Sequence, residues 1–264
     1  MKYILYALLF IWMIGCSRKN TNQELAMPKE IIDLGALVTE DLPDKVWGEA
    51  FMKRYGFEDN NSFNVVQWKY DFPDGIVSGS NAYYTLFNHG GPHVDAPIHI
   101  NIGKGIDDYP LQAFVGPLKV IDASNFPFGR SITVEEIKQH KIARGDIVLI
   151  YTAYKLPDSD ALPKRIALTQ EAAEYLAKLP VRAFGTDAFN VESDDDTSPV
   201  NSESALERIA PIHYSFLSRR IPIYEQLFNV KKLIGKQNMY FVGPPLNIEN
   251  GDGMMVRPVV LVYD

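Results

Sequence analysis

The sequence predicts an α/β fold in a single domain. After residue 30, short apolar segments alternate with stretches of helical pattern, and no Gly/Ser-rich linker or charge block divides them. Several apolar segments are continuous rather than alternating, which is typical of strands in a sheet covered on both faces. A chain of 264 residues is long enough to bury a large core in one such domain.

Seven segments are predicted as strands of this fold. Each contains residues with high strand propensity, such as Val, Ile, Tyr and Phe, and most are bounded by Gly, Pro or Asp. In chain order they span residues 31–34, 83–88, 118–122, 146–151, 183–187, 239–242 and 256–262.

Three segments are predicted as helices. Residues 133–140 and 169–179 each begin with a threonine, a common helix-capping residue, and carry glutamate in the first turn. Residues 202–217 have a helical pattern that we expect Pro211 to interrupt, because proline has no amide hydrogen to donate.

The composition excludes several classes of function. The chain carries 26 Lys and Arg against 33 Asp and Glu, a net charge of −7, with no basic block. We therefore expect no nucleic-acid partner, because phosphate binding needs a basic surface. One cysteine can form neither an internal disulfide nor a cysteine-based zinc site, so histidines and carboxylates would have to hold any metal.

The N-terminus is predicted to be a signal peptide followed by a lipidation site. Residues 3–14 are apolar but too few for the roughly 20 that span a bilayer. Met13 and Gly15 before Cys16 resemble a bacterial lipobox; the alternative is an ordinary secretory peptide. We expect residues 1–15 to be removed, a lipid on Cys16, a tether over 16–29 and a domain over 30–264. The protein would then be an exported, membrane-anchored lipoprotein with its domain in the periplasm or outside the cell.

Three of the five histidines lie in one eleven-residue segment, 89–99. Pro92 and Pro97 predict an extended chain rather than a helix, and in an extended chain residues two apart face the same side. Four side chains of metal-ligand type share that parity: His89, His93, Asp95 and His99. Imidazole and carboxylate together are a donor set suited to Zn²⁺ or Mn²⁺. The segment therefore predicts a metal site.

This segment, HGGPHVDAPIH, resembles the HxGTHxDxPxH signature of the metal-dependent cyclase/hydrolase family, which includes bacterial kynurenine formamidase (arylformamidase) and the isatin hydrolases. The similarity continues in short motifs along the chain, among them Gly116-Pro117, Gly185-Thr186-Asp187 and Asp252-Gly253. It implies a domain of mixed β-sheets in the swivelling β/β/α, cyclase-like arrangement with flanking helices.

The resemblance also implies roles for individual residues. By position, His89, His93 and Asp95 would bind one metal ion, Asp95 would bridge to a second, and His99 would be the catalytic acid/base. His213 and Glu225 match the family's downstream His and Glu, twelve residues apart, and would complete the second site. The implied cofactors are two divalent ions, zinc in preference to manganese.

The resemblance implies cleavage of a C–N amide bond in a small molecule by an arylformamidase-like hydrolase, and an assembly that is a homodimer or larger. An aromatic substrate would suit a group of aromatic residues upstream of the signature. These could select the substrate or, particularly Tyr83 and Tyr84, pack in the core. The group comprises Trp68, Tyr70, Phe72, Tyr83 and Tyr84.

Some positions depart from the family pattern. Pro92 replaces the signature Thr, Gly35 replaces a hydroxyl residue, and Asn190 and Glu192 stand where Ser and Asp are usual. These departures affect the expected substrate more than the expected catalysis. The acidic run 192–196, which includes Glu192, is predicted to be a solvated loop.

Two alternatives remain open from the sequence. One is opening of a cyclic amide with a single manganese ion, as in the isatin hydrolases; Glu225, which single-metal members tend to replace by Gln, favours two metals. The other is a lipoprotein that binds a metal or a small ligand without turnover. His99 weighs against it, because mere capture needs no acid/base.

Overall fold

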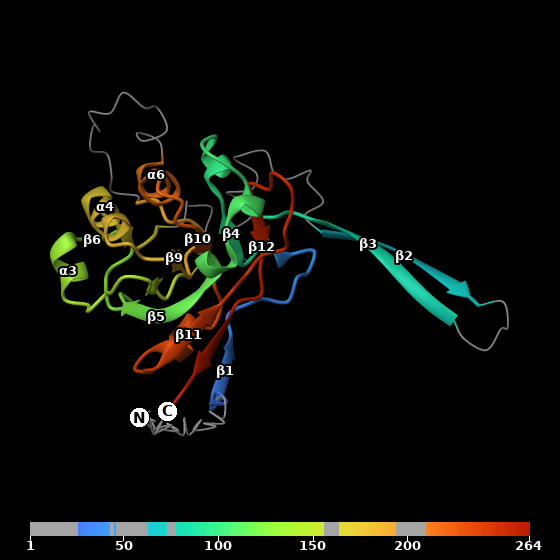
Figure 1. Cartoon of the computed structure of the whole chain (residues 1–264), viewed down its shortest axis with the longest axis horizontal. Helices are drawn as coiled ribbons and strands as arrows, with labels where there is room; N and C mark the ends of the chain where they lie inside the picture. Colours follow the sequence, from blue (N-terminus) through green and yellow to red (C-terminus); the bar gives the residue numbers. More distant parts are fainter. Residues whose placement is uncertain (1–25, 43–44, 46–62, 73–77, 156–163, 194–209) are drawn as a thin grey trace, which may run out of the picture.

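The computed structural model describes residues 26–42, 45, 63–72, 78–155, 164–193 and 210–264. One nine-stranded mixed sheet forms the body of the molecule (Figure 1). Its strands, in spatial order, are β1 (Glu30–Asp33), β13 (Val259–Val262), β11 (Met239–Val242), β5 (Val115–Asp122), β7 (Ile147–Tyr151), β9 (Ala183–Thr186), β10 (Ile223–Glu225), β4 (His93–Asp95) and β12 (Gly253–Met255).

The middle of the sheet is parallel and its flanks are antiparallel. Strands β5, β7, β9 and β10 run parallel to one another. Strand β11 pairs antiparallel with β5 on one side, and β4 pairs antiparallel with β10 on the other. The carboxyl ends of the four parallel strands therefore lie along the same edge of the sheet, and β4 is the next strand beyond β10.

The core lies on both faces of this sheet, which explains the continuous apolar runs. In β7, Val148 and Ile150 belong to one buried cluster, whereas Ile147 and Leu149 belong to another on the opposite face. Alternate side chains of a strand point to opposite faces, so a strand covered on both faces must be apolar throughout. The prediction of a doubly covered sheet is confirmed.

Helices α3 (Val134–Lys138), α4 (Gln170–Lys178) and α6 (Pro211–Leu217) lie on one side of the body. Thr133 and Thr169 cap α3 and α4 as predicted. Pro211 occupies the first turn of α6, where a missing amide hydrogen costs nothing. Residues 202–209 of the predicted helix lie outside the described residues, so its interruption at Pro211 stays a prediction.

Smaller elements complete the fold. Two short strands, β6 (Ser131–Ile132) and β8 (Ala167–Leu168), pair in parallel. Among the described residues, four 3₁₀ turns connect larger elements: η1 (Pro97–Ile100), η2 (Ile106–Asp108), η3 (Leu111–Phe114) and η4 (Val230–Leu233).

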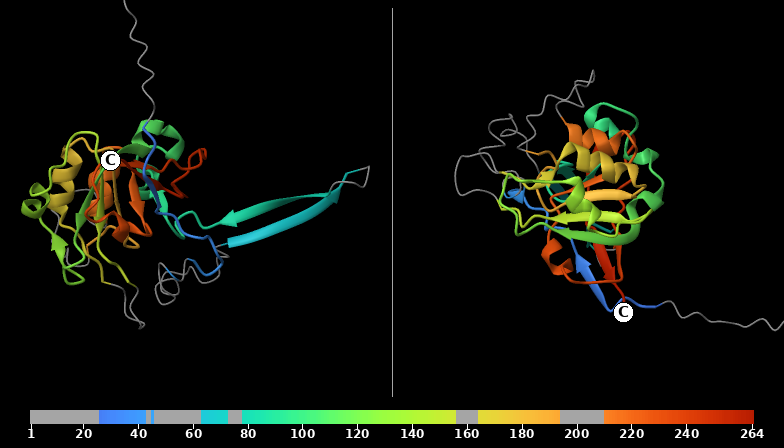
Figure 2. Two further views of the ribbon diagram at one scale, coloured as in Figure 1. Left: turned by 90° about the horizontal axis from the view of Figure 1, so that it is seen from below. Right: turned by 90° about the vertical axis from the view of Figure 1, so that its left-hand side faces the viewer.

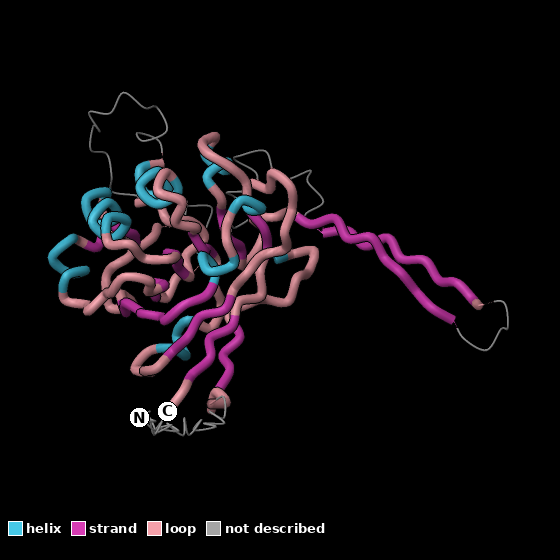
Figure 3. Tube along the Cα trace, viewed as in Figure 1, coloured by secondary structure: helices cyan, strands magenta, loops and turns pink. Residues whose placement is uncertain are grey.

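Strands β2 (Phe63–Asp71) and β3 (Ser78–Leu86) form an antiparallel hairpin outside the main sheet, which we call the arm. The arm projects far from the body in Figure 1, and the left view of Figure 2 and the trace in Figure 3 agree. Of the two alternatives for Tyr83 and Tyr84, core packing is wrong, because these side chains are 71% and 64% exposed. The segment predicted as strand 83–88 is the end of β3 and the turn that follows it.

Candidate metal centre

The centre is built on β4, which lies between β10 and β12. In this register Asp95 pairs with Ile223 and Gly253, and His93 pairs with Glu225. Asp95, His93 and Glu225 are buried on adjacent strands. Sheet pairing thus brings Glu225 to the signature segment, although 130 positions separate it from Asp95.

His93 is oriented by the backbone of its own loop. Its Nδ1 donates to the carbonyl oxygen of Gly91 at 2.8 Å, which fixes Nε2 as the nitrogen that faces the centre. That Nε2 lies 3.3 Å from Asp95 Oδ1 and 3.6 Å from Glu225 Oε2. A histidine held by a carbonyl on one nitrogen presents a lone pair on the other, as metal ligands do.

His89 comes from the turn that precedes β4. Its Nδ1 lies 3.0 Å from Asp95 Oδ1 and its Nε2 lies 3.1 Å from Asp252 Oδ2. Gly253 permits this packing, because a Cβ atom there would lie 2.7 Å from Cε1 of the His89 ring. A side chain at position 253 would displace the imidazole.

His213 is carried by α6. Its Nδ1 lies 2.6 Å from Oε1 of Glu192, and its Nε2 lies 3.6 Å from Glu225 Oε1 and 3.8 Å from Asp95 Oδ2. Glu192 also accepts hydrogen bonds from the amides of Ile212 and His213 in the first turn of α6. One carboxylate therefore positions both the helix and its histidine.

The prediction that Glu192 belongs to a solvated loop is wrong. The side chain is only 17% exposed because it packs against α6; residues 194–196 of that run lie outside the described residues. Glu192 and His213 are 21 positions apart, and their contact depends on how β9 and α6 pack. Apart from the departure noted at this position, no pattern in the sequence pointed to this contact.

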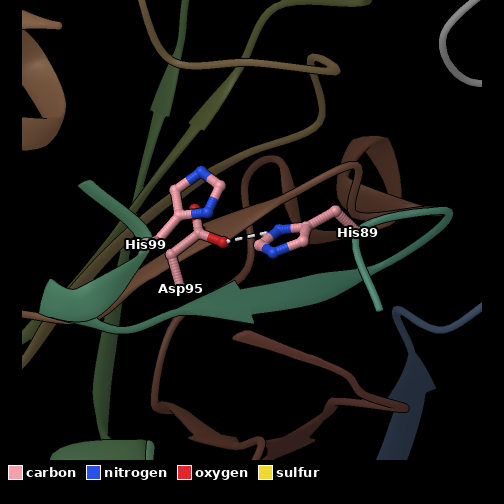
Figure 4. Close-up of side chains that lie close together, drawn as sticks. All are labelled: His89, Asp95 and His99. Atoms are coloured by element: carbon pink, nitrogen blue, oxygen red, sulfur yellow. Dashed lines mark ion pairs between the residues drawn. The ribbon is translucent and has the colours of Figure 1, made fainter. Parts of the chain in front are cut away.

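His99 reaches the centre from a helical turn rather than from an extended chain. Pro97 begins η1, since proline fits the first position of a helical turn, so the predicted extension through residue 99 is wrong. The ring centroid of His99 still lies 4.3 Å from that of His89 and 5.7 Å from that of His213. Figure 4 shows the His89, Asp95 and His99 side chains gathered together. The His99 side chain is 31% exposed, so it borders solvent.

Asp252 links the two histidines at the exposed side of the centre. Its Oδ2 lies 3.1 Å from His89 Nε2 and 3.8 Å from His99 Nδ1, and its Oδ1 accepts a hydrogen bond from Asn88. The sequence identified this residue only within the Asp252-Gly253 motif and assigned it no role. Its pairing with His89, 163 positions away, follows from the β12–β4 pairing.

The carboxylates in this centre attract positive charge strongly. Burial opposes protonation of His89 and His213, but hydrogen bonds and charges from neighbouring acids prevail, and raise the pKa of His89 to about 10 and of His213 to about 9. Burial likewise opposes ionisation of Asp95, yet the surrounding histidines hold its pKa well below the usual value. Burial and the charge of Asp95 raise the pKa of Glu225.

The residues present fit a divalent cation. Both carboxylate oxygens of Asp95 and Nε2 of His213 are buried without a hydrogen-bond partner among the described residues, which is costly unless something compensates them. Two sets of ligand atoms each lie within 4.8 Å of one another and share Asp95. The first contains His89, Asp95 and His99; the second contains His93, Asp95 and Glu225.

All six predicted site residues therefore meet in one place. The donor set is imidazole and carboxylate without thiolate, which suits borderline and hard divalent ions. His99 lies close enough to His89 and Asp95 either to bind an ion or to exchange a proton with a bound molecule. In the part of the chain that the structure describes, no helix is long and apolar enough to cross a bilayer.

Comparisons with known proteins agree with this architecture. A family model, Cyclase, matches residues 32–193. The kynurenine formamidase of Salinibacter ruber is 33% identical over 178 residues, which are 66% of this chain and 76% of that protein. The kynurenine formamidase of Bacillus cytotoxicus is 30% identical over 182 residues, 67% of this chain and 77% of that protein.

Solved structures share the fold. Isatin hydrolase A from Labrenzia aggregata superimposes with a TM-score of 0.65 at 23% identity, covering 89% of this chain and 94% of that one. A structure described as a potential metal-dependent hydrolase with cyclase activity gives a TM-score of 0.61 at 21% identity, covering 89% and 98%. The predicted mixed α/β, cyclase-like domain is confirmed.

Proposed function

The chain belongs to the Cyclase family, and from that premise we propose that it is a metal-dependent hydrolase of the C–N bond of small amides, with arylformamidase-like chemistry. The observation that carries this proposal is the convergence of four histidines and two carboxylates from three distant segments on one partly open site. The names of the relatives, kynurenine formamidase and isatin hydrolase, describe amide hydrolases and support the same reaction class.

We propose that the centre binds two divalent ions, with zinc favoured over manganese. His89, His93 and Asp95 would hold one ion, and Asp95, His213 and Glu225 would hold the other. The shared, fully buried Asp95 supports a bridging role, since each of its oxygens faces imidazole nitrogens. A divalent ion held by these residues would supply Lewis acidity: it would polarise a carbonyl group and would lower the pKa of water from about 15.7 to roughly 7.

Proton transfer is assigned to His99. Its Nδ1 faces Asp252, so Nε2 is the nitrogen that can deliver a proton to the leaving amine. Hydrolysis of an amide needs this step, because an unprotonated amine anion is a very poor leaving group. Asp252 orients the His99 ring. The nearby His89 holds the pKa of Asp252 well below its usual value, so Asp252 stays ionised.

The substrate class that we propose is an aromatic N-formyl amide. A cyclic amide, opened with one manganese ion, is the second candidate, supported by the structural similarity to isatin hydrolase A. Glu225 favours the first, because it adds a second carboxylate to the centre. Assays of the purified domain with Zn²⁺ or Mn²⁺ against N-formylaniline derivatives and isatin would separate the two.

Metal counting tests the centre itself. Elemental analysis of active protein should find two divalent ions per chain, and activity should disappear with chelation and return with added metal. Active protein without stoichiometric metal would contradict the proposal. Metal bound tightly, with no turnover of either amide class, would favour a binding lipoprotein instead.

We also propose that the protein is exported and anchored by a lipid on Cys16, with residues 1–15 removed, residues 16–29 as a tether and the hydrolase domain over 30–264. The lipobox-like residues before Cys16 support this; they lie outside the described residues. Mass spectrometry of the mature protein should find an acylated N-terminal Cys16. An intact Met1 or an unmodified Cys16 would contradict the anchor.

A homodimer or larger assembly is proposed on the evidence of the arm. One face of the arm carries Val66, Trp68, Tyr70 and Tyr83, which are between 39% and 71% exposed. A two-stranded hairpin is at best marginally stable by itself in water, so this apolar face needs a covering surface. A second copy of the chain would supply one, because closed symmetric pairs are the most frequent protein assemblies.

A further inference from the structure

A cavity lies at the carboxyl ends of β7 and β9. It has a volume of about 480 Å³ and is closed on one side by the loop from Gln226 to Lys231. None of the six proposed metal-site residues lines it. Gln226, which lines the cavity, follows Glu225 in the chain and donates a hydrogen bond to the carbonyl oxygen of His89. The cavity therefore has its own lining but borders the metal centre.

The lining is rich in aromatic rings. Tyr151, Tyr154, Phe189 and Phe228 all line the cavity. The rings of Tyr154 and Phe189 lie with their centroids 5.5 Å apart, and Phe228 is 39% exposed. Small-molecule sites commonly have volumes of about 300–1,000 Å³ and aromatic walls. Walls of this kind suit a flat aromatic ligand.

The mouth of the cavity carries an excess of positive charge. Three lysines, Lys45, Lys155 and Lys231, line it and are exposed. Lys45 is paired with Asp41, whereas Lys155 and Lys231 form no ion pair with a described residue. The acid at the cavity, Asp187, is half-buried and accepts hydrogen bonds from the amide and the hydroxyl of Thr152.

The floor offers one unused acceptor. The side chain of Gln226 is buried, and its Nε2 donates to the carbonyl oxygens of His89 and Phe189. Its Oε1 accepts no hydrogen bond from a described residue. An unsatisfied buried amide oxygen costs about 1–3 kcal/mol, which a ligand with an N–H or O–H group would recover.

Backbone strain is concentrated here as well. Seven residues other than glycine have positive φ in the described structure, and three of them, Ala153, Gln226 and Asn229, line this cavity. Such conformations persist where the surrounding structure enforces them, and they cluster at ligand sites.

We propose that this cavity is a binding site for a small aromatic carboxylate that carries a hydrogen-bond donor. The ring would lie against the aromatic wall, the carboxylate would contact Lys155 and Lys231, and the donor would face Gln226 Oε1. The inference does not depend on amide hydrolysis at the metal centre.

Calorimetric titration of the metal-loaded protein with indole-3-carboxylate tests the proposal. We expect saturable binding with a dissociation constant of about 1 mM or tighter. The double variant Lys155→Glu, Lys231→Glu should weaken binding by about tenfold or more, because it removes two charge-assisted contacts. The control variant Lys119→Glu, Lys141→Glu changes the same charge at exposed sites elsewhere and should bind as the parent does.

Two further titrations show which group of the ligand is recognised and at which site. 3-Methylindole, which lacks the carboxylate, should bind about tenfold more weakly than indole-3-carboxylate or not at all; equal affinity would overturn the proposal. Binding should survive chelation of the metal. Binding that disappears with the metal but is unchanged in the lysine variant would place the carboxylate on the metal centre and overturn the second site, as would the absence of any binding.

Discussion

At the scale of the residue, the centre depends on how each imidazole is held. His93 is held by a backbone carbonyl, His89 by Asp252 and His213 by Glu192. Each contact fixes one ring nitrogen and directs the other toward shared carboxylates, an arrangement that usually strengthens metal binding.

His99→Ala should separate catalysis from metal binding. We expect turnover to fall by about 10²–10⁴-fold, the usual contribution of a positioned acid/base, while elemental analysis still finds two metal ions per chain. His140→Ala, which changes an exposed histidine outside the centre, should leave turnover unchanged. Near-parental turnover in His99→Ala would refute the assigned proton transfer. Loss of bound metal from this variant would instead show that His99 is a metal ligand.

Glu192→Ala should weaken the metal centre without touching a proposed ligand. Loss of a carboxylate that orients a ligating histidine typically costs about 10–100-fold in metal affinity, and competition with a chelator would measure it. Glu192→Gln should recover part of the affinity, because an amide oxygen can still accept from His213. Exposed Glu171→Ala in α4 is the matched control. Unchanged metal affinity in Glu192→Ala would contradict the positioning role.

At the scale of the element, the structure separates two kinds of strand. Strands of the main sheet are apolar because both of their faces are covered, whereas β2 and β3 of the arm are exposed along nearly their whole length. The arm ends at Leu86, three residues before His89. A surface that covered the base of the arm would therefore also lie near the connection to the metal centre.

Charging the aromatic face of the arm should reduce self-association. Trp68 and Tyr83 lie on one face with ring centroids 5.0 Å apart. The variant Trp68→Glu, Tyr83→Glu should shift the sedimentation-velocity profile toward monomer, because burying two charges in an apolar interface is unfavourable. Gln67→Glu, Ser80→Glu adds the same charge on the opposite face and should associate as the parent does. A parental profile for both variants would show that the arm is not the interface.

At the scale of the whole molecule, the centre joins β4, β10 and α6, so its charge balance should affect global stability. Without metal, protonated His89 and His213 neutralise the buried carboxylates. Their pKa values are raised from 6.5 to about 10 and about 9, so their contribution to stability is complete below about pH 6.5 and is lost as the pH rises through about 9 to 10.

Metal removal should therefore destabilise the protein more at high pH than at low pH. At high pH the histidines are neutral, so only metal ions compensate the charge of the buried carboxylates. At low pH the histidines are protonated, and metal binding must first displace these protons. We expect the difference in Tm between metal-loaded and chelated protein to widen from pH 6.5 to pH 9, as measured by differential scanning calorimetry. A difference that is constant or shrinks would contradict this charge balance.

The sequence by itself determined the fold class, most of the central strands, the capped helices and the ligand-type residues of 89–95. These are local properties: strand parity, capping chemistry and residue type are encoded within a few positions. Assignment of His213 and Glu225 to the same centre came from family resemblance, and the structure brings them there.

Only the tertiary structure decided which distant residues support the centre and where the aromatic residues lie. The contacts of Glu192 with α6 and of Asp252 with His89 follow from helix packing and from the order of strands β10, β4 and β12. The pattern of side chains along β2 and β3 is compatible both with a strand that covers a core and with one that projects into solvent. Strand order and packing are properties of the assembled sheet, so no local pattern in the chain specifies them.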